Sequence, residues 1–254
     1  MALAKTPNRG IILAAATITC SFSGAIYMWS IFTNPMIAEH GWGVQEISLA
    51  YSLFLLVSTF SGIACGKLQQ VIDTRFLMII AGVMESIGWG GTGFATSIPM
   101  LYFTFGVIGG LGDGIVYNLS ITVATRWFPE KPGFASGFCT GCVALSALVF
   151  APLGQFFISR FDASGSFKLC GLIFLAFFLV FSWFLKLPPA DYRPEIEEKP
   201  GKKKARAFEE YPPDFTAGQM LSQPLFWVIW FALLFACSSG LMVTAHTSGI
   251  GQRQ

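Results

Sequence analysis

The sequence predicts an all-α membrane protein, in which a six-helix bundle is followed by a charged linker and a seventh helix. Three observations predict this class. Of the 254 residues, 54% are hydrophobic and only 12% are charged, the mean hydropathy is +0.61, and apolar segments of about 20 residues recur along the chain. Soluble chains carry about 25% charged residues, so a soluble domain could not cover this much apolar surface. The composition also argues against a secreted disulfide-rich protein and a nucleic-acid-binding protein.

Seven segments are long and apolar enough to cross a bilayer. They are expected near residues 11–37, 47–68, 76–95, 100–125, 134–158, 167–187 and 225–245. The first is too long for a cleaved signal peptide, and further spans follow it. We therefore expect three units: a six-helix bundle at 1–187, a cytoplasmic charged linker at 188–223, and a seventh helix at 224–254 that begins an incomplete second bundle.

The positions of lysine and arginine predict the orientation of the chain in the membrane. With the N-terminus in the cytoplasm, 13 of the 16 basic residues lie on the cytoplasmic side, and only Arg160, Lys168 and Arg253 lie outside. Cytoplasmic loops carry such an excess. The sequence therefore predicts a multi-pass protein of the plasma membrane with a cytoplasmic N-terminus. The basic run at 202–206 is interpreted as part of this topology signal, with contact to anionic lipid as the alternative.

The first and fourth spans share a short motif that indicates an internal repeat. Residues 24–30 read GAIYMWS and residues 114–120 read GIVYNLS, so that Gly, Tyr and Ser match. In transporters built from two six-helix bundles, each bundle often consists of two three-helix units related by an inverted repeat. Such a repeat relates the first span to the fourth. Glycines spaced by four also predict close contacts between helices. They stand at positions 62 and 66, at 106, 110 and 114, and at 133, 137 and 141.

Two acidic residues, Glu85 and Asp113, lie near the midpoints of their predicted spans. A charge at this depth costs at least a few kcal/mol, so such residues face the bundle interior or water. Both are candidates for proton coupling. The alternative is a structural acid that holds helices together, which we favour for Glu85, whereas we favour a functional role for Asp113. No Lys or Arg stands at this depth to neutralise either acid, so at least one is expected to be protonated at rest.

Polar and aromatic residues on the first and fourth spans form a candidate substrate-binding set. The set is Tyr27, Trp29, Tyr117 and Asn118. An aromatic wall with a few hydrogen-bond donors suits a small organic substrate. Ordinary core aromatics with hydrogen-bonded hydroxyls are the equally weighted alternative.

The sequence contains no constellation typical of an enzyme, a cofactor site or a metal site. His40 and His246 are far apart in the chain, so they do not predict a metal site. A nucleotide-binding P-loop is missing, so ATP is not the expected energy source. Cys139 and Cys142 have the spacing of redox and zinc motifs but no second pair, and we interpret them as packing residues. We therefore expect neither catalysis nor a cofactor nor a metal.

The loop after the second span resembles the signature loop of the major facilitator superfamily. Gly66, Leu68 and Arg75 match that signature, whereas Gln70 stands at its acidic position and Asp73 at a later glycine position. Gly66, Asp73 and Arg75 are therefore candidates for a conformational loop, with Asp73 supplying the acid from a shifted position. Finer matches resemble the oxalate/formate antiporter branch of the superfamily. They lie at 24–30, 41–42, 47–50, 109–117, 126–131, 133–137, 150–153, 224–227 and 239–242.

This resemblance implies a six-helix N-terminal bundle plus the first helix of a C-terminal bundle, and alternating-access exchange of small carboxylates. It also implies that Tyr27, Trp29 and Tyr117 face the substrate. Asp113 stands where that branch is usually apolar, which favours proton coupling or a different substrate. The basic residues that bind the anion in this branch lie on later helices. The expected partners are a small carboxylate, the lipid bilayer and the missing C-terminal six-helix half, and no nucleic acid.

Three other functions fit parts of the pattern. A major facilitator transporter could carry another small solute, such as a sugar, a drug or a bile acid. The chain could also be a truncated fragment, or a half-size partner protein, that does not transport. A seven-span receptor is disfavoured by the cytoplasmic N-terminus, the linker and the repeat.

Overall fold

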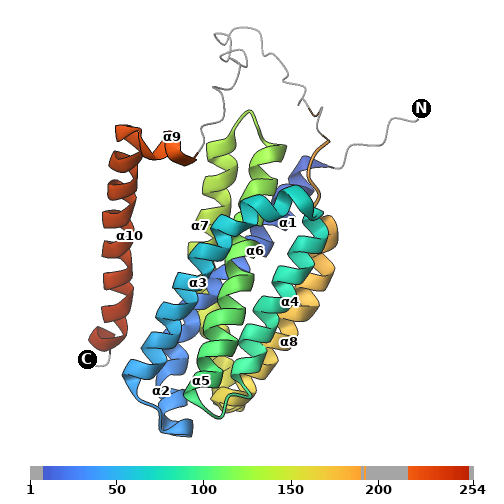
Figure 1. The fold of residues 1–254 in the computed structure, drawn as a ribbon. Coiled ribbons are helices and arrows are strands. Elements are labelled where there is room, and N and C mark those ends of the chain that lie inside the picture. Colours follow the sequence, from blue (N-terminus) through green and yellow to red (C-terminus); the bar gives the residue numbers. More distant parts are fainter. Residues whose placement is uncertain (1–7, 190–191, 193–216, 252–254) are drawn as a thin grey trace. The chain divides into compact units, whose positions relative to one another are not determined.

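The computed structural model describes residues 8–189, 192 and 217–251, and every regular element in these ranges is helical. The chain forms two compact units, Met1–Pro194 and Glu195–Gln254, which are described separately (Figure 1). Arg253, the basic run at 202–206 and most of the predicted linker lie outside the described residues. The predicted boundaries at 187 and 223 stay a prediction.

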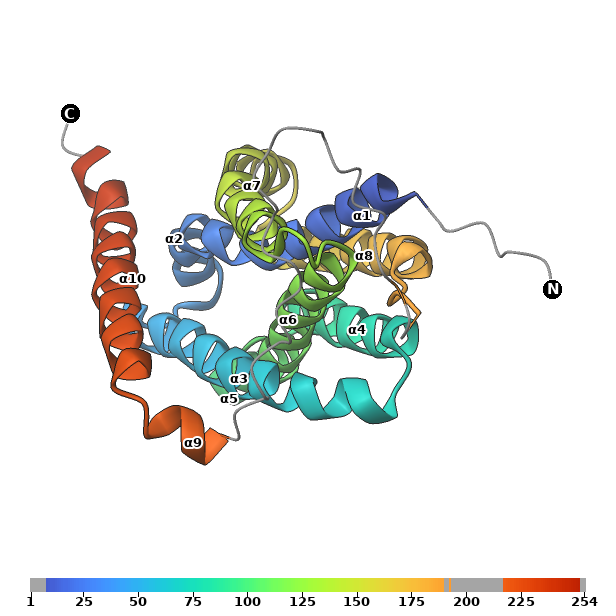
Figure 2. The same ribbon diagram turned by 90° about the horizontal axis from the view of Figure 1, so that it is seen from above.

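The first unit contains the helical bundle. In chain order its described elements are α1 (Arg9–Phe22), η1 (Ser23–Met28), α2 (Trp29–His40), α3 (Val44–Val71), α4 (Thr74–Thr92), α5 (Ile98–Leu101), η2 (Tyr102–Gly109), α6 (Gly110–Trp127), α7 (Pro132–Arg160), α8 (Ala163–Phe181) and η3 (Ser182–Phe184). Helix α6 packs against α1, α3, α4 and α7, so it lies in the middle of the bundle (Figure 2). The second unit contains α9 (Ala217–Leu221) and α10 (Pro224–Gly251).

Within the described residues, five helical segments are long and apolar enough to cross a membrane. They are Arg9–His40, Val44–Val71, Ile98–Trp127, Pro132–Arg160 and Ala163–Phe184, and they match the first, second, fourth, fifth and sixth predicted spans. The third predicted span is the helix α4, which is not among these five. Its hydropathy is lowered by the charged residues Arg75 and Glu85 and by the glycines of its last turn. The seventh coincides with α10, in which Pro224–Ser238 is a shorter apolar helix.

Helix boundaries in the bundle follow from local capping. The side chains of Asn8, Asp73 and Asp162 each accept a hydrogen bond from a backbone N–H in the first turn of α1, α4 and α8. Such N-caps satisfy donors that have no partner within the helix. Gly41 has a φ of 71° and ends α2, because this left-handed conformation is accessible to glycine without strain.

The first and fourth spans are the irregular ones. The chain tightens into a 3₁₀ helix at Ser23–Met28 in the first span and widens into a π-helix at Tyr102–Gly109 in the fourth. Both kinds of interruption often mark functional sites in helices. The sequence did not predict either of them.

Close glycine contacts are present on the fourth span. A Cβ at Gly106 would lie 2.7 Å from Leu53 Cδ2, and a Cβ at Gly110 would lie 2.7 Å from the backbone oxygen of Phe54, both on α3. This glycine row therefore lets two helix backbones approach closely, as predicted. The expectation is wrong for the row at positions 133, 137 and 141 on α7, where an added Cβ would meet no described atom within 4 Å.

Two glycine contacts support the predicted inverted repeat. Gly24 in the first span faces the Ser146 hydroxyl and the Val143 backbone oxygen on the fifth, whereas Gly114 in the fourth faces the hydroxyl of Ser61 and the backbone oxygen of Ser58 on the second. In both cases the serine hydroxyl donates to that oxygen, three residues earlier, at 2.6 Å in α7 and 3.1 Å in α3. Exchanging the first span with the fourth and the second with the fifth converts one contact into the other.

Candidate functional site

Two carboxyl groups lie in the interior of the bundle. Glu85 on α4 is 1% exposed and Asp113 on α6 is 8% exposed. The two helices meet at Gly112, where an added Cβ would lie 2.6 Å from the backbone oxygen of Ala81 and would also clash with the backbone nitrogen of Glu85. A residue without a side chain at position 112 therefore lets α6 contact the turn of α4 that carries Glu85.

Asp113 is held by one hydrogen bond. The Ser58 hydroxyl on α3 donates to Asp113 Oδ2 at 2.7 Å. The other carboxylate oxygen, Oδ1, is buried and has no hydrogen-bond partner among the described residues, and the same is true of Glu85 Oε2. The Ser23 hydroxyl, at the start of η1, lies near Asp113 without forming a hydrogen bond to it. The carboxylate thus sits between the second and first spans with one oxygen still available.

Neither acid forms an ion pair with a cation in the part of the chain that the structure describes. The ion pairs among the described residues are Arg9–Glu130 and His40–Glu39, neither of which involves Glu85 or Asp113. Asp113 directly follows Gly112, the point at which α6 contacts the backbone of Glu85 on α4, so the two acids are close neighbours. Like charges this close disfavour full ionisation of both groups in a medium of low dielectric constant. The pair is therefore an uncompensated acidic centre in an otherwise apolar bundle.

The four residues of the candidate substrate-binding set occupy different environments. Trp29 is 5% exposed and stacks on Phe105 with ring centroids 3.8 Å apart, so it belongs to the core. Tyr27 is 39% exposed. Tyr117 is half-buried, and Asn118 donates to the backbone oxygen of Gly114 at 2.9 Å. The four side chains therefore differ in exposure and in contacts, and their role in substrate binding stays a prediction.

Helix α3 contributes groups that sequence analysis missed. Tyr51 lies close enough to Tyr27 to interact with it electrostatically, and Ser58 binds Asp113. These two residues are seven apart, which places them on one face of a helix. The sequence did not single them out, because the same span carries four further hydroxyl residues, Ser48, Ser52, Thr59 and Ser61.

The candidate conformational loop lies between α3 and α4. Asp73 Oδ1 accepts from the backbone nitrogen of Arg75 at 2.9 Å, so this carboxylate caps α4. The Arg75 guanidinium carbon lies 5.9 Å from the centre of the Trp183 ring. A Cβ at Gly66 would meet no described atom within 4 Å. The side chains of Asp73 and Arg75 form no ion pair with each other, and the conformational role of the loop stays a prediction.

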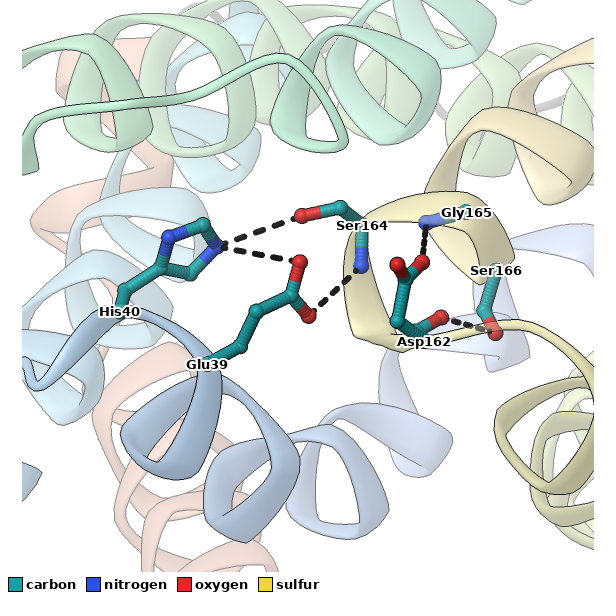
Figure 3. Close-up of polar contacts among 6 residues, drawn as sticks. All are labelled: Glu39, His40, Asp162, Ser164, Gly165 and Ser166. Atoms are coloured by element: carbon teal, nitrogen blue, oxygen red, sulfur yellow. Dashed lines mark hydrogen bonds and ion pairs between the residues drawn. The ribbon is translucent and has the colours of Figure 1, made fainter.

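A second polar cluster joins the end of the first span to the start of the sixth (Figure 3). Glu39 Oε2 accepts from the backbone nitrogen of Ser164 at 3.2 Å, and His40 Nε2 lies 3.3 Å from the Ser164 hydroxyl. The His40 ring stacks on Trp42, with centroids 4.3 Å apart. Glu39 therefore supplements Asp162 in satisfying the first N–H groups of α8. The sequence placed His40 in a loop and gave no sign of this contact.

The helical bundle, with five segments that are long and apolar enough to cross a membrane, is that of a multi-pass membrane protein. The sequence model of the Major Facilitator Superfamily matches residues 13–252, and the chain belongs to this superfamily. Its fold resembles the crystal structure of a bacterial homolog of the human lysosomal transporter Spinster, in an inward-facing and unoccupied conformation. The TM-score is 0.62 at 17% identity, over 77% of this chain and 47% of that one.

Particular relatives are similar along most of the chain. The oxalate:formate antiporter of Oxalobacter formigenes is 28% identical over 241 residues, which cover 95% of this chain and 55% of that protein. The MFS-type transporter YhjX of Escherichia coli K12 is 26% identical over 96% of this chain and 58% of its own length. Monocarboxylate transporter 4 of Gallus gallus is 27% identical over 80% of this chain and 43% of its own. The chain thus spans about half the length of the curated relatives that it matches.

Proposed function

We propose that this chain forms the N-terminal half of a secondary transporter that moves small carboxylates across the plasma membrane by alternating access, with its N-terminus in the cytoplasm. One observation carries this proposal: an acidic centre without a cation, Asp113 with Glu85, lies inside a bundle whose relatives include an oxalate:formate antiporter and a monocarboxylate transporter. The excess of Lys and Arg at one end of the spans supports the orientation.

In this proposal Asp113 takes up and releases a proton during transport. Burial of two neighbouring carboxylates with no cation favours a state in which at least one carries a proton. The hydrogen bond from Ser58 supports the ionised form of Asp113, and its second oxygen has no partner. Both protonation states of this residue therefore have structural support, which a proton-coupling group needs.

The acids favour proton-coupled uptake over exchange of dicarboxylates. An ionised Asp113 would repel a substrate with two negative charges. A monocarboxylate that enters together with a proton adds no net charge to the bundle. The cation that would bind the carboxylate itself is expected on helices outside this bundle.

Substrate contact is assigned to the first and fourth spans, with Tyr51 added from the second. The exposure of Tyr27 and its proximity to Tyr51 support a contact by these two hydroxyl groups. The burial of Trp29 against Phe105 supports an indirect role, in which the indole holds the irregular turn at Ser23–Met28 in place. Tyr117 and Asn118 follow Asp113 on α6 by about one turn and complete the proposed set.

The substrate class is tested by transport in proteoliposomes that contain the gene product that includes this chain. Uptake of a labelled monocarboxylate is measured with the outside acidic, and formate, acetate, lactate, oxalate, glucose and taurocholate are added as competitors. We expect monocarboxylates to compete best and glucose and taurocholate not to compete, with protein-free liposomes as the blank. Competition by the sugar or the bile acid, but not by carboxylates, would assign a different cargo.

A further inference from the structure

A cavity of about 640 Å³ lies at the end of the bundle where α3 and η3 finish and α4 begins. One wall runs from Gln69 in the last turn of α3 to Phe76 in the first turn of α4, and the other is formed by Trp183 and by Leu185–Leu187, which follow α8. Its volume falls within the range of about 300–1,000 Å³ that is usual for ligand sites. The buried acids and the candidate substrate residues do not line it.

Two cationic side chains line this cavity. They are Arg75, on the first turn of α4, and Lys186. Asp73 is the only acid among the lining residues, and one of its carboxylate oxygens is already bound to the α4 backbone. Arg75 Nε is buried and has no hydrogen-bond partner among the described residues. The cavity therefore presents net positive charge and an unused donor.

The position of Lys186 is fixed by its backbone. The indole nitrogen of Trp127, which is fully buried, donates to the Lys186 backbone oxygen at 2.6 Å. Leu185 next to it is also fully buried. This anchoring holds the segment after α8 against the bundle and places the exposed Lys186 side chain at the cavity.

The rim of the cavity is apolar. Phe76 is 67% exposed and Trp183 is 65% exposed, and both line the cavity. In membrane proteins, Trp side chains are enriched at the level of the lipid headgroups, which fits Trp183, and the exposed Phe76 adds apolar surface beside it. Cations inside an apolar, aromatic rim match a molecule that combines an anionic head with hydrocarbon tails.

We propose that this cavity binds the headgroup phosphate of an anionic membrane phospholipid. Arg75 and Lys186 contact the phosphate, because guanidinium and ammonium groups are the usual partners of phosphate oxygens. The acyl chains run along Phe76 and Trp183. A free anion would satisfy the cations but would leave the aromatic rim without a partner, so the lipid is the assigned occupant.

The test measures lipid binding to the purified gene product by native mass spectrometry, with phosphatidylglycerol and phosphatidylcholine compared at equal concentration. The variants are Arg75→Gln and Lys186→Gln, and the matched control is Lys67→Gln, an exposed lysine at the end of α3 that does not line the cavity. We expect phosphatidylglycerol to bind more tightly than phosphatidylcholine. Each variant should lose about fivefold in phosphatidylglycerol affinity, the effect of one cation near an anionic surface, while the control is unchanged.

Two further measurements keep the result decisive. Arg75→Lys retains the charge and should recover most of the affinity, which separates a charge effect from misfolding. Lys186 is exposed, so its replacement leaves the core intact. Inorganic phosphate is added as a competitor at millimolar concentration. Equal binding of both lipids, equal loss in the Lys67→Gln control, or displacement of the lipid by inorganic phosphate would each overturn the proposal.

Discussion

The hydroxyl of Ser58 on α3 donates a hydrogen bond of 2.7 Å to the carboxylate of Asp113 on α6. This contact links the second span to the fourth at the level of the buried acidic centre. It also leaves the second oxygen of Asp113 without a partner in the described structure. The Ser58–Asp113 pair is therefore expected to affect both the stability of the bundle and the proposed uptake of a proton.

Removal of the Ser58 hydroxyl should destabilise the protein. Ser58→Ala leaves a buried carboxylate oxygen without its donor, and such a loss costs about 1–3 kcal/mol. Ser52→Ala is the matched control, because Ser52 is exposed and bonds only to the backbone of its own helix. The free energy of unfolding in mixed detergent micelles should fall for the first variant and change little for the second. Equal losses would show that the Ser58 contact adds nothing.

A methyl group at Gly114 should not fit. The Cβ of Gly114→Ala would clash with the backbone oxygen of Ser58, which cannot move aside as a flexible side chain can. Overpacking of this kind costs about 1–3 kcal/mol. Gly137→Ala is the control, since a Cβ there meets no described atom within 4 Å. The measurement is the thermal unfolding temperature in detergent, and an unchanged value for Gly114→Ala would contradict the close helix contact.

The inverted repeat predicts that Gly24→Ala behaves like Gly114→Ala. Gly24 faces Ser146 and Val143 of α7 as Gly114 faces α3, so the two substitutions should lower the unfolding temperature by similar amounts. The double variant should lose roughly the sum of both, because separated sites are about additive. A large loss for one glycine and none for the other would argue that the two contacts are unrelated.

The Arg9–Glu130 ion pair and the Trp127–Lys186 hydrogen bond should contribute different amounts to the free energy of unfolding. Arg9 and Glu130 form an ion pair of 2.8 Å whose side chains are 36% and 20% exposed, and partly solvated pairs contribute only about 0–1 kcal/mol. Trp127 is fully buried and donates to the Lys186 backbone oxygen. Trp127→Phe should therefore destabilise more than Arg9→Gln. The free energies of unfolding decide the comparison, and the opposite order would contradict it.

The sequence predicted the position of residues along the spans better than the neighbours toward which their side chains point. Hydropathy located five spans, and the rarity of charge picked out Glu85 and Asp113, since a deep acid stands out in any apolar segment. The glycine row on the fourth span was also predicted correctly. These features depend on depth and spacing, which a linear pattern records.

The rotation of each helix about its own axis depends on its neighbours and was not predictable. Trp29 packs in the core against Phe105, and an added Cβ at the glycines of the α7 row would meet no described atom within 4 Å. Ser58 gave no sign that it would meet a residue 55 positions later. The interruptions at Ser23–Met28 and Tyr102–Gly109 contain no proline that would have marked them in the sequence.

Proton-driven uptake by the Asp113→Asn variant tests the central claim most directly. Asparagine keeps the size of the side chain and can still accept from Ser58, so the fold should persist. In proteoliposomes with the outside acidic, we predict that the variant loses the acceleration of carboxylate uptake by the pH gradient but retains exchange at equal pH. Glu130→Gln, an acid at the bundle end, is the control and should behave as the unmodified protein. Undiminished acceleration by the gradient in Asp113→Asn would contradict the assignment of Asp113 as the proton-coupling group.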